Sequence, residues 1–179
     1  MTDSPSFEHM LCSWASKDTR DEVLKIVIDD PSRMDELMEC FFHKDLRISH
    51  NAAWPIGYIT QRKPGSLNPY LKKMINNLDE PHHDAVVRNT FRTFQFVQFP
   101  EDLEGLVFEK AFNYLLDVEY AIAIRVFAMT VCANIAMKYP DLCHELIPVI
   151  EDHLPHGSTG FKSRGNKLLI ELRKLLDES

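Results

Sequence analysis

The sequence predicts an all-α protein in which helices are stacked as pairs. Two markers alternate four times along the chain: a proline expected to open one helix, and an anchor residue expected near the start of the next. After the anchors, apolar and small residues recur at separations of 3, 4 and 7 positions, the period of a helix and not of a strand. Because a single helix pair cannot bury its own apolar face, the repetition predicts an elongated core shared by stacked pairs.

Length and composition agree with one folded domain over residues 1–179. Hydrophobic residues make up 45% and charged residues 26%, a balance typical of globular proteins. No apolar run approaches the roughly 18 to 20 residues needed to cross a bilayer, and the first residues lack the basic start and apolar stretch of a secretory signal. We therefore expect a cytoplasmic protein without membrane contact. In that reducing compartment its four cysteines are expected to be small buried side chains that form no disulfide: Cys12, Cys40, Cys132 and Cys143.

The net charge of −7 is unevenly distributed along the chain. Residues 1–45 contain 11 acidic and 5 basic residues, whereas residues 46–179 contain 16 acidic and 15 basic residues. An acidic chain is disfavoured for general nucleic-acid binding, which depends on the neutralisation of phosphates. A local basic face in the later part of the chain stays open.

The first helix of each pair is predicted to begin at a proline, because the N–H that proline lacks would have no partner in the first helical turn. Four prolines are spaced by 38, 31 and 40 residues, and an aliphatic residue follows each at the sixth position: Pro31, Pro69, Pro100 and Pro140. Asp30 and Asn68 directly precede two of these prolines and are the expected N-caps.

The second helix of each pair follows an anchor residue. The anchors are spaced by 39, 37 and 39 residues: Ser49, Arg88, Arg125 and Arg164. In the first pair, Pro55 is expected to bend the helix, because it removes a backbone hydrogen bond. In the second pair, the alternation FQFVQF within residues 91–99 leaves two interpretations open, a helix that is apolar all round and a strand.

The helix pairs divide the chain into four repeats: residues 31–66, 67–99, 100–139 and 140–179. Residues 1–30 are expected to form an N-terminal helical cap with a polar outer face. Its two short helices are predicted around residues 6–16 and 19–28, with Asp18 or Thr19 as the N-cap of the second.

Over about residues 31–176 the pattern resembles the HEAT repeat. Each unit of this pattern consists of a helix that begins at a proline, a short turn, an acidic residue followed by an arginine, and a second helix of small residues. The matching residues are Asp84 with Arg88, Glu119 with Arg125, Ala52-Ala53-Trp54 with Gly57, and Pro148. The resemblance implies a right-handed α-α superhelix of about four HEAT-like pairs. It also implies that Arg88, Arg125 and Arg164 order neighbouring repeats by reaching acids of the adjacent turn.

No metal site is predicted. The cluster at residues 82–84, His-His-Asp, is interpreted as a solvated turn, because adjacent histidines do not readily share one ion. Two other pairs have zinc-like spacing, His9 with Cys12 and Cys40 with His43. Both pairs lie in apolar stretches expected to be helical, so packing in the core is their expected role.

No catalytic or cofactor-binding site is predicted either. The segment Gly157-Ser158-Thr159-Gly160 precedes a helix, as anion sites do, but lacks the sequence of a phosphate-binding loop and is interpreted as a flexible turn. No serine or histidine lies in a recognisable nucleophile motif.

Candidate partner-binding residues are aromatic or basic: Trp54, Tyr58, Arg88, Arg92, Arg125, Arg164 and Lys167. Trp54 and Tyr58 are four positions apart and share one helical face, either as an interface anchor or as core between repeats. Besides the structural role given above, the basic residues would contribute to a stripe that holds an acidic peptide or a phosphate backbone.

The expected function is that of a non-enzymatic scaffold whose concave face, made by the second helices, binds a protein or peptide. An alternative from the same resemblance is a HEAT-like DNA-binding protein or a DNA glycosylase that acts on alkylated bases. A third is a maturation factor related to HEAT-like lyases that service protein-bound chromophores. No residue of the sequence separates this third alternative from the scaffold.

Overall fold

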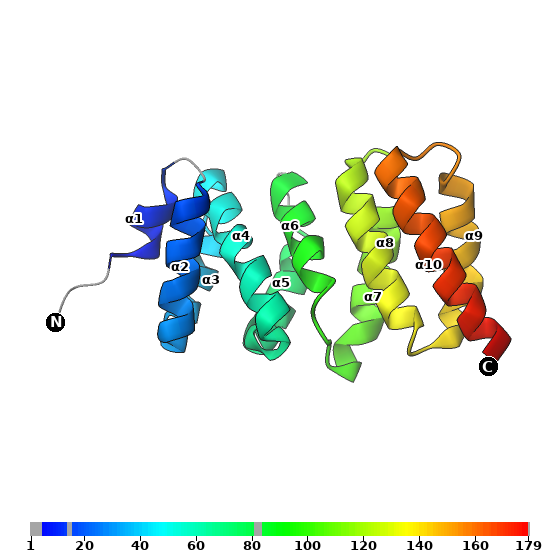
Figure 1. The fold of residues 1–179 in the computed structure, drawn as a ribbon, viewed down its shortest axis with the longest axis horizontal. Coiled ribbons are helices and arrows are strands. Elements are labelled where there is room, and N and C mark those ends of the chain that lie inside the picture. Colours follow the sequence, from blue (N-terminus) through cyan, green and yellow to red (C-terminus); the bar gives the residue numbers. More distant parts are fainter. Residues whose placement is uncertain (1–4, 14–15, 81–83, 179) are drawn as a thin grey trace. The chain divides into compact units, whose positions relative to one another are not determined.

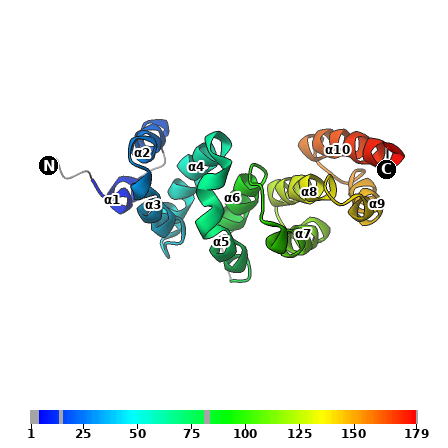
Figure 2. The ribbon, with the colours of Figure 1, turned by 90° about the horizontal axis from the view of Figure 1, so that it is seen from below.

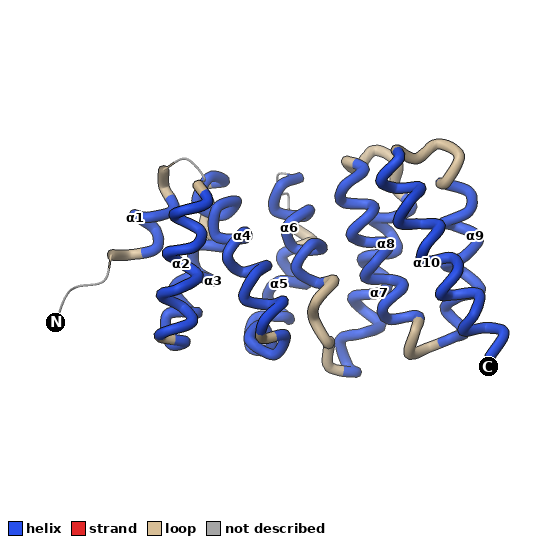
Figure 3. The backbone as a smooth tube through the Cα atoms, in the orientation of Figure 1, coloured by secondary structure: helices blue, strands red, loops and turns tan. Residues whose placement is uncertain are grey.

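The computed structural model describes residues 5–13, 16–80 and 84–178, and all regular structure in these ranges is helical (Figure 3). The described chain divides between Gln98 and Phe99 into two compact units, residues 1–98 and residues 99–179. A continuous single domain over residues 1–179 stays a prediction.

Unit 1 contains six α-helices among its described residues (Figure 1). They are α1 (Phe7–Leu11), α2 (Lys17–Asp29), α3 (Met34–Phe41), α4 (Leu46–Arg62), α5 (Leu71–Asn77) and α6 (Asp84–Phe94), with 3₁₀ segments η1 (Pro31–Arg33) and η2 (Pro64–Tyr70). Within this unit, α2, α4 and α6 form one layer and α1, α3 and α5 the other (Figure 2). Helix α4 is central, because it packs against α2, α3 and α6.

Unit 2 contains two longer helix pairs. They are α7 (Glu101–Leu116) with α8 (Ile122–Ala136), and α9 (Cys143–His153) with α10 (Thr159–Glu178), joined by the 3₁₀ segment η3 (Pro140–Leu142). Helix α8 packs against both α7 and α10, so nearly every residue in its second half is buried. Gly165 of α10 allows a close approach to α9, since a Cβ there would lie 2.9 Å from Leu154 Cδ2.

Three of the four prolines stand at the start of a first helix as predicted, whereas Pro69 lies inside η2, before α5. Pro31 and Pro140 begin η1 and η3, which lead directly into α3 and α9, and Pro100 is the residue before α7. Asp30 is the predicted N-cap, since its carboxylate accepts a hydrogen bond from Ser32 N at 3.1 Å. The N-cap predicted at Asn68 is wrong, because this residue lies inside η2 and α5 begins later without a side-chain cap.

Three further local expectations are corrected. The N-cap of α2 is Ser16, whose extended backbone lets its hydroxyl accept from Thr19 N at 2.9 Å, whereas Asp18 already lies inside the helix. Helix α1 is much shorter than residues 6–16. The strand interpretation of residues 91–99 is wrong, because Phe91 and Phe94 are fully buried core residues of α6 and an irregular segment follows the helix.

Candidate partner-binding surface

In its middle part, helix α4 leaves one narrow stripe accessible. Between Ile48 and Thr60 every residue is buried except His50, Trp54 and Tyr58. These three residues are spaced by four positions, so their side chains lie on one face of the helix, and the exposed Arg62 continues that face. Since α2, α3 and α6 cover the other sides of α4, the accessible residues of its middle part are aromatic or basic, while Leu46 and Gln61 are exposed near its ends.

A second stripe lies on the neighbouring helix α6. After the exposed Asp84 at its start, the accessible residues of α6 are Ala85, Arg88 and Arg92, again spaced by three or four positions. The two helices approach closely, because a Cβ added at Gly57 of α4 would lie 4.0 Å from Thr93 Oγ1 of α6. The predicted candidates Trp54, Tyr58, Arg88 and Arg92 thus belong to adjacent helices of one layer.

Arg20 of α2 fixes both aromatic rings of α4. Its guanidinium carbon lies 4.7 Å from the centre of the Trp54 ring and 4.6 Å from that of Tyr58. Nη1 donates to the Tyr58 hydroxyl at 3.3 Å, while Nε and Nη2 donate to one carboxylate oxygen of Asp21 at 2.8 and 2.6 Å. Arg62 adds a weaker contact, 5.8 Å from the centre of the Tyr58 ring. The accessible rings are therefore held in place before any partner arrives.

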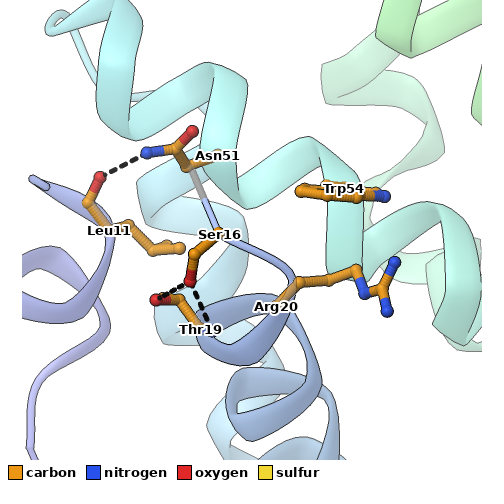
Figure 4. A pocket seen from close by; sticks show the side chains of 6 residues that line it. All are labelled: Leu11, Ser16, Thr19, Arg20, Asn51 and Trp54. Atoms are coloured by element: carbon orange, nitrogen blue, oxygen red, sulfur yellow. Dashed lines mark hydrogen bonds between the residues drawn. The ribbon is translucent and has the colours of Figure 1, made fainter. Parts of the chain in front are cut away.

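A shallow pocket lies beside Trp54, where α2 and the end of α1 meet α4 (Figure 4). Its lining is Leu11, Ser16, Thr19, Arg20, Asn51 and Trp54. Asn51 builds the pocket by donating to Leu11 O at 2.8 Å and to Ser13 O at 2.9 Å, so the segment after α1 is attached to α4. We refer below to His50, Trp54, Tyr58, Arg62, Arg88 and Arg92, together with this pocket, as the α4–α6 surface.

The α4–α6 surface lies in the basic part of an acidic chain. Residues 46–98 contain 7 basic and 3 acidic residues, a net charge of +4 against −7 for the whole chain. Arg62, Arg88 and Arg92 form no ion pair with any carboxylate in the part of the chain that the structure describes. These three charges therefore have no direct carboxylate partner in the described residues, and the nearest acid along α6 is Asp84, one turn before Arg88.

Arg125 lies inside unit 2. It is 8% exposed, its Nε donates to Leu115 O at the end of α7 at 3.1 Å, and its Nη2 donates to His153 Nδ1 of α9 at 2.8 Å. Burial lowers the pKa of Arg125, and the nearby Asp117 partly opposes this effect. The pKa of His153 is lowered by burial and then by the charge of Arg125. These contacts give Arg125 the structural role of joining three helices.

The last two candidates lie on α10 of unit 2. Arg164 and Lys167 are exposed, and Lys167 Nζ lies 3.9 Å from Glu171 Oε1, one helical turn away. Within residues 5–13, 16–80 and 84–178, neither Arg88 nor Arg164 pairs with an acid of an adjacent turn, so the arginine ladder implied by the resemblance does not form at these two positions.

Sequence reasoning missed Arg20, His50 and Arg62. His50 and Arg62 carried a usable signal, because each is four residues from Trp54 or Tyr58 on the same helical face. Arg20 carried none, since it precedes Trp54 by 34 positions and its contact with the rings is long-range.

The metal-like clusters do not assemble in the described residues, where no group of three His, Cys, Asp or Glu side chains is placed to hold an ion. Cys12 is exposed, contrary to the expected core position, because α1 ends before it. Cys40 is buried, and burial raises the pKa of its thiol to about 11. His82 and His83 lie outside the described residues.

The segment at residues 157–160 leads into α10, which begins at Thr159. Ser158 Oγ accepts a hydrogen bond from Phe161 N at 3.2 Å, as an N-cap does. Gly157 has no room for a side chain, because a Cβ there would lie 2.6 Å from Phe161 Cδ1. The glycine is thus explained by packing at a helix start.

No helix among the described residues is long and apolar enough to span a membrane. Comparison with curated proteins and with solved structures found no match. Residues 7–172 match the HEAT repeat domain, which covers both units and nearly the whole chain. With its layered helix pairs and this match, the chain belongs to the HEAT-repeat family.

Proposed function

We propose that this protein is a non-enzymatic scaffold that binds a protein or peptide through the α4–α6 surface. The observation that carries the proposal is the accessible stripe of α4, which consists of His50, Trp54 and Tyr58 on a helix that is otherwise buried between Ile48 and Thr60. Tryptophan, tyrosine and arginine are the residue types that contribute most to protein–protein affinity.

The fixed rings support this role energetically. Binding usually costs about 0.5–1.5 kcal/mol for each flexible side chain that becomes ordered. Trp54 and Tyr58 already have their positions set by Arg20, so much of this cost is absent for them. The α4–α6 surface corresponds to the second-helix face that the sequence assigns to partner binding. The concave superhelix and the cytoplasmic location stay predictions.

A binding measurement with matched variants tests the proposal. The full chain is immobilised, binding proteins from the native host are identified, and the affinity of a purified partner is measured for the wild type, Trp54→Ala and Ile170→Ala. Ile170 is a suitable control, because it is 69% exposed on α10 of unit 2. We expect Trp54→Ala to weaken binding by about 30-fold or more, the effect of a hot spot of about 2 kcal/mol, and Ile170→Ala to bind like the wild type. Equal affinities for all three proteins would refute the assignment of this surface.

A further inference from the structure

We infer that the partner segment is acidic, with carboxylates that pair with Arg62, Arg88 and Arg92 and an apolar side chain that covers Trp54. This inference rests on the proposed function and specifies the chemistry of the partner.

The first argument is that the three arginines have no direct carboxylate partner in the described residues. Helix α4 contains no acidic residue, and α6 contains one, Asp84, at its first position. Elsewhere in the described chain several cations do have a carboxylate partner: Arg33 pairs with Glu36, Lys138 with Glu104 and Arg173 with Glu151, whereas the exposed Arg164 resembles the three arginines in having none. Arginine presents its N–H donors in a planar fork that matches a carboxylate, so three unpaired arginines beside an aromatic stripe favour a ligand with several carboxylates.

The surface already binds one carboxylate at its edge. Asp21 accepts two hydrogen bonds from Arg20, at 2.8 and 2.6 Å, while the guanidinium of Arg20 stacks on the Trp54 and Tyr58 rings. In this group a guanidinium contacts an aromatic ring and binds a carboxylate at the same time. We infer the same combination for the complex, with the carboxylate supplied by the partner. Arg62 lies 5.8 Å from the centre of the Tyr58 ring and donates from Nη1 to Tyr58 O at 3.3 Å. No carboxylate of the described residues pairs with it, so a carboxylate of the partner would complete the arrangement there.

The pocket beside Trp54 is the reason why we infer an apolar side chain in the partner. Leu11 and the Trp54 ring supply apolar lining, and the hydroxyls of Ser16 and Thr19 are bonded to each other at 2.8 Å. An aliphatic side chain suits this lining better than a charged one, because Arg20, the charged residue of the pocket, is already paired with Asp21. The matching ligand alternates carboxylates with at least one aliphatic residue.

A polypeptide fits this surface better than a nucleic acid. Helix α2, next to α4, exposes Asp18, Asp21 and Glu22, and the chain as a whole carries a net charge of −7. A phosphate backbone has a charge at every nucleotide and would meet these acids, whereas a peptide can place its carboxylates only where the arginines are.

Peptide probes test the inference. Binding to the full chain is measured by fluorescence anisotropy for a short labelled peptide of alternating Glu and Leu, for its Gln and Lys counterparts, and for a short DNA duplex. We expect the Glu peptide to bind most tightly and to weaken as salt is added. The double variant Arg88→Gln/Arg92→Gln should lose about tenfold or more in affinity, because two charge-assisted contacts are removed. The control Lys162→Gln/Lys174→Gln, which removes two exposed charges of α10, should bind like the wild type.

Each other outcome overturns the inference in a distinguishable way. Equal binding of the Glu and Gln peptides, lost in Trp54→Ala, would refute the acidic partner but leave the α4–α6 surface in place. Binding of the Glu peptide that neither Trp54→Ala nor the arginine variant changes would refute the surface itself. If the DNA duplex binds more tightly than the Glu peptide, the partner is a nucleic acid and not a peptide. If the Glu peptide does not bind at low salt, the inference is refuted. Circular dichroism of each variant confirms that it is folded.

Discussion

Replacement of Arg20 tests how the α4 aromatic stripe is held in place. The side chain of Arg20 is only 10% exposed and contacts Trp54, Tyr58 and Asp21. The substitution Arg20→Met keeps most of the packing volume but removes the guanidinium. Arg20→Lys keeps the charge but loses the planar group that contacts both rings.

The expected loss of stability follows from these contacts. Two cation–π contacts in a largely desolvated position contribute about 1 kcal/mol each, and the hydrogen bond to Tyr58, at 3.3 Å, contributes about 0.5 kcal/mol. The ion pair with the half-exposed Asp21 adds little, because solvent screens it. Arg20→Met should therefore destabilise unit 1 by about 2 kcal/mol, and Arg20→Lys by about half of that.

Urea unfolding followed by circular dichroism measures the effect. With a urea dependence of about 2 kcal/mol per M, the midpoint of Arg20→Met should fall by about 1 M. The variant should also bind the partner more weakly than the wild type, because its rings are no longer fixed. The proposed packing would be refuted if Arg20→Met unfolded at the same urea concentration as the wild type. It would also be refuted if Arg20→Lys unfolded at a lower urea concentration than Arg20→Met.

Three further predictions concern stability. Ser16→Ala should cost about 1 kcal/mol in urea unfolding, because it removes the N-cap of α2, and a loss below about 0.3 kcal/mol would contradict that role. Glu104→Gln should destabilise unit 2 by about 1–2 kcal/mol at neutral pH, because the buried carboxylate accepts from Lys138; an unchanged midpoint would refute this. The pKa of His153 is lowered by burial and by Arg125, so its contribution to stability is present above about pH 6.5 and lost as the pH falls through the folded pKa. Stability between about pH 7.5 and about pH 5 should fall more steeply for the wild type than for His153→Gln, and parallel profiles would exclude this linkage.

Local signals in the sequence predicted the helical architecture well. Pro31 and Pro140 lie in the first turn of a 3₁₀ segment and Pro100 directly precedes α7, because proline is tolerated at a helix start whatever surrounds it. Asp30 is an N-cap through a local hydrogen bond from the backbone N–H of Ser32. The failures were also local. Asn68 is a good N-cap residue, but the 3₁₀ segment η2 extends past it to Tyr70.

The partner-binding surface was only partly predictable. The spacing of Trp54 and Tyr58 placed both on one face, but whether that face is buried depends on how α2, α3 and α6 pack around α4. Likewise, the repeat pattern marks Arg88 and Arg125 as equivalent positions. Tertiary packing buries Arg125 among α7, α9 and α10, whereas Arg88 stays partly exposed. Periodicity shows which residues share a face, whereas exposure is a property of the whole fold.

The most direct test of the binding surface is the indole N–H resonance of Trp54 in the presence of the native partner. The chain has two tryptophans, so the substitution Trp54→Phe assigns the signal. We predict that the Trp54 resonance shifts or broadens as the partner is added, together with the amide resonances of Arg88 and Arg92. A partner that binds while these signals stay unchanged, with all perturbed resonances confined to residues 99–179, would contradict the account.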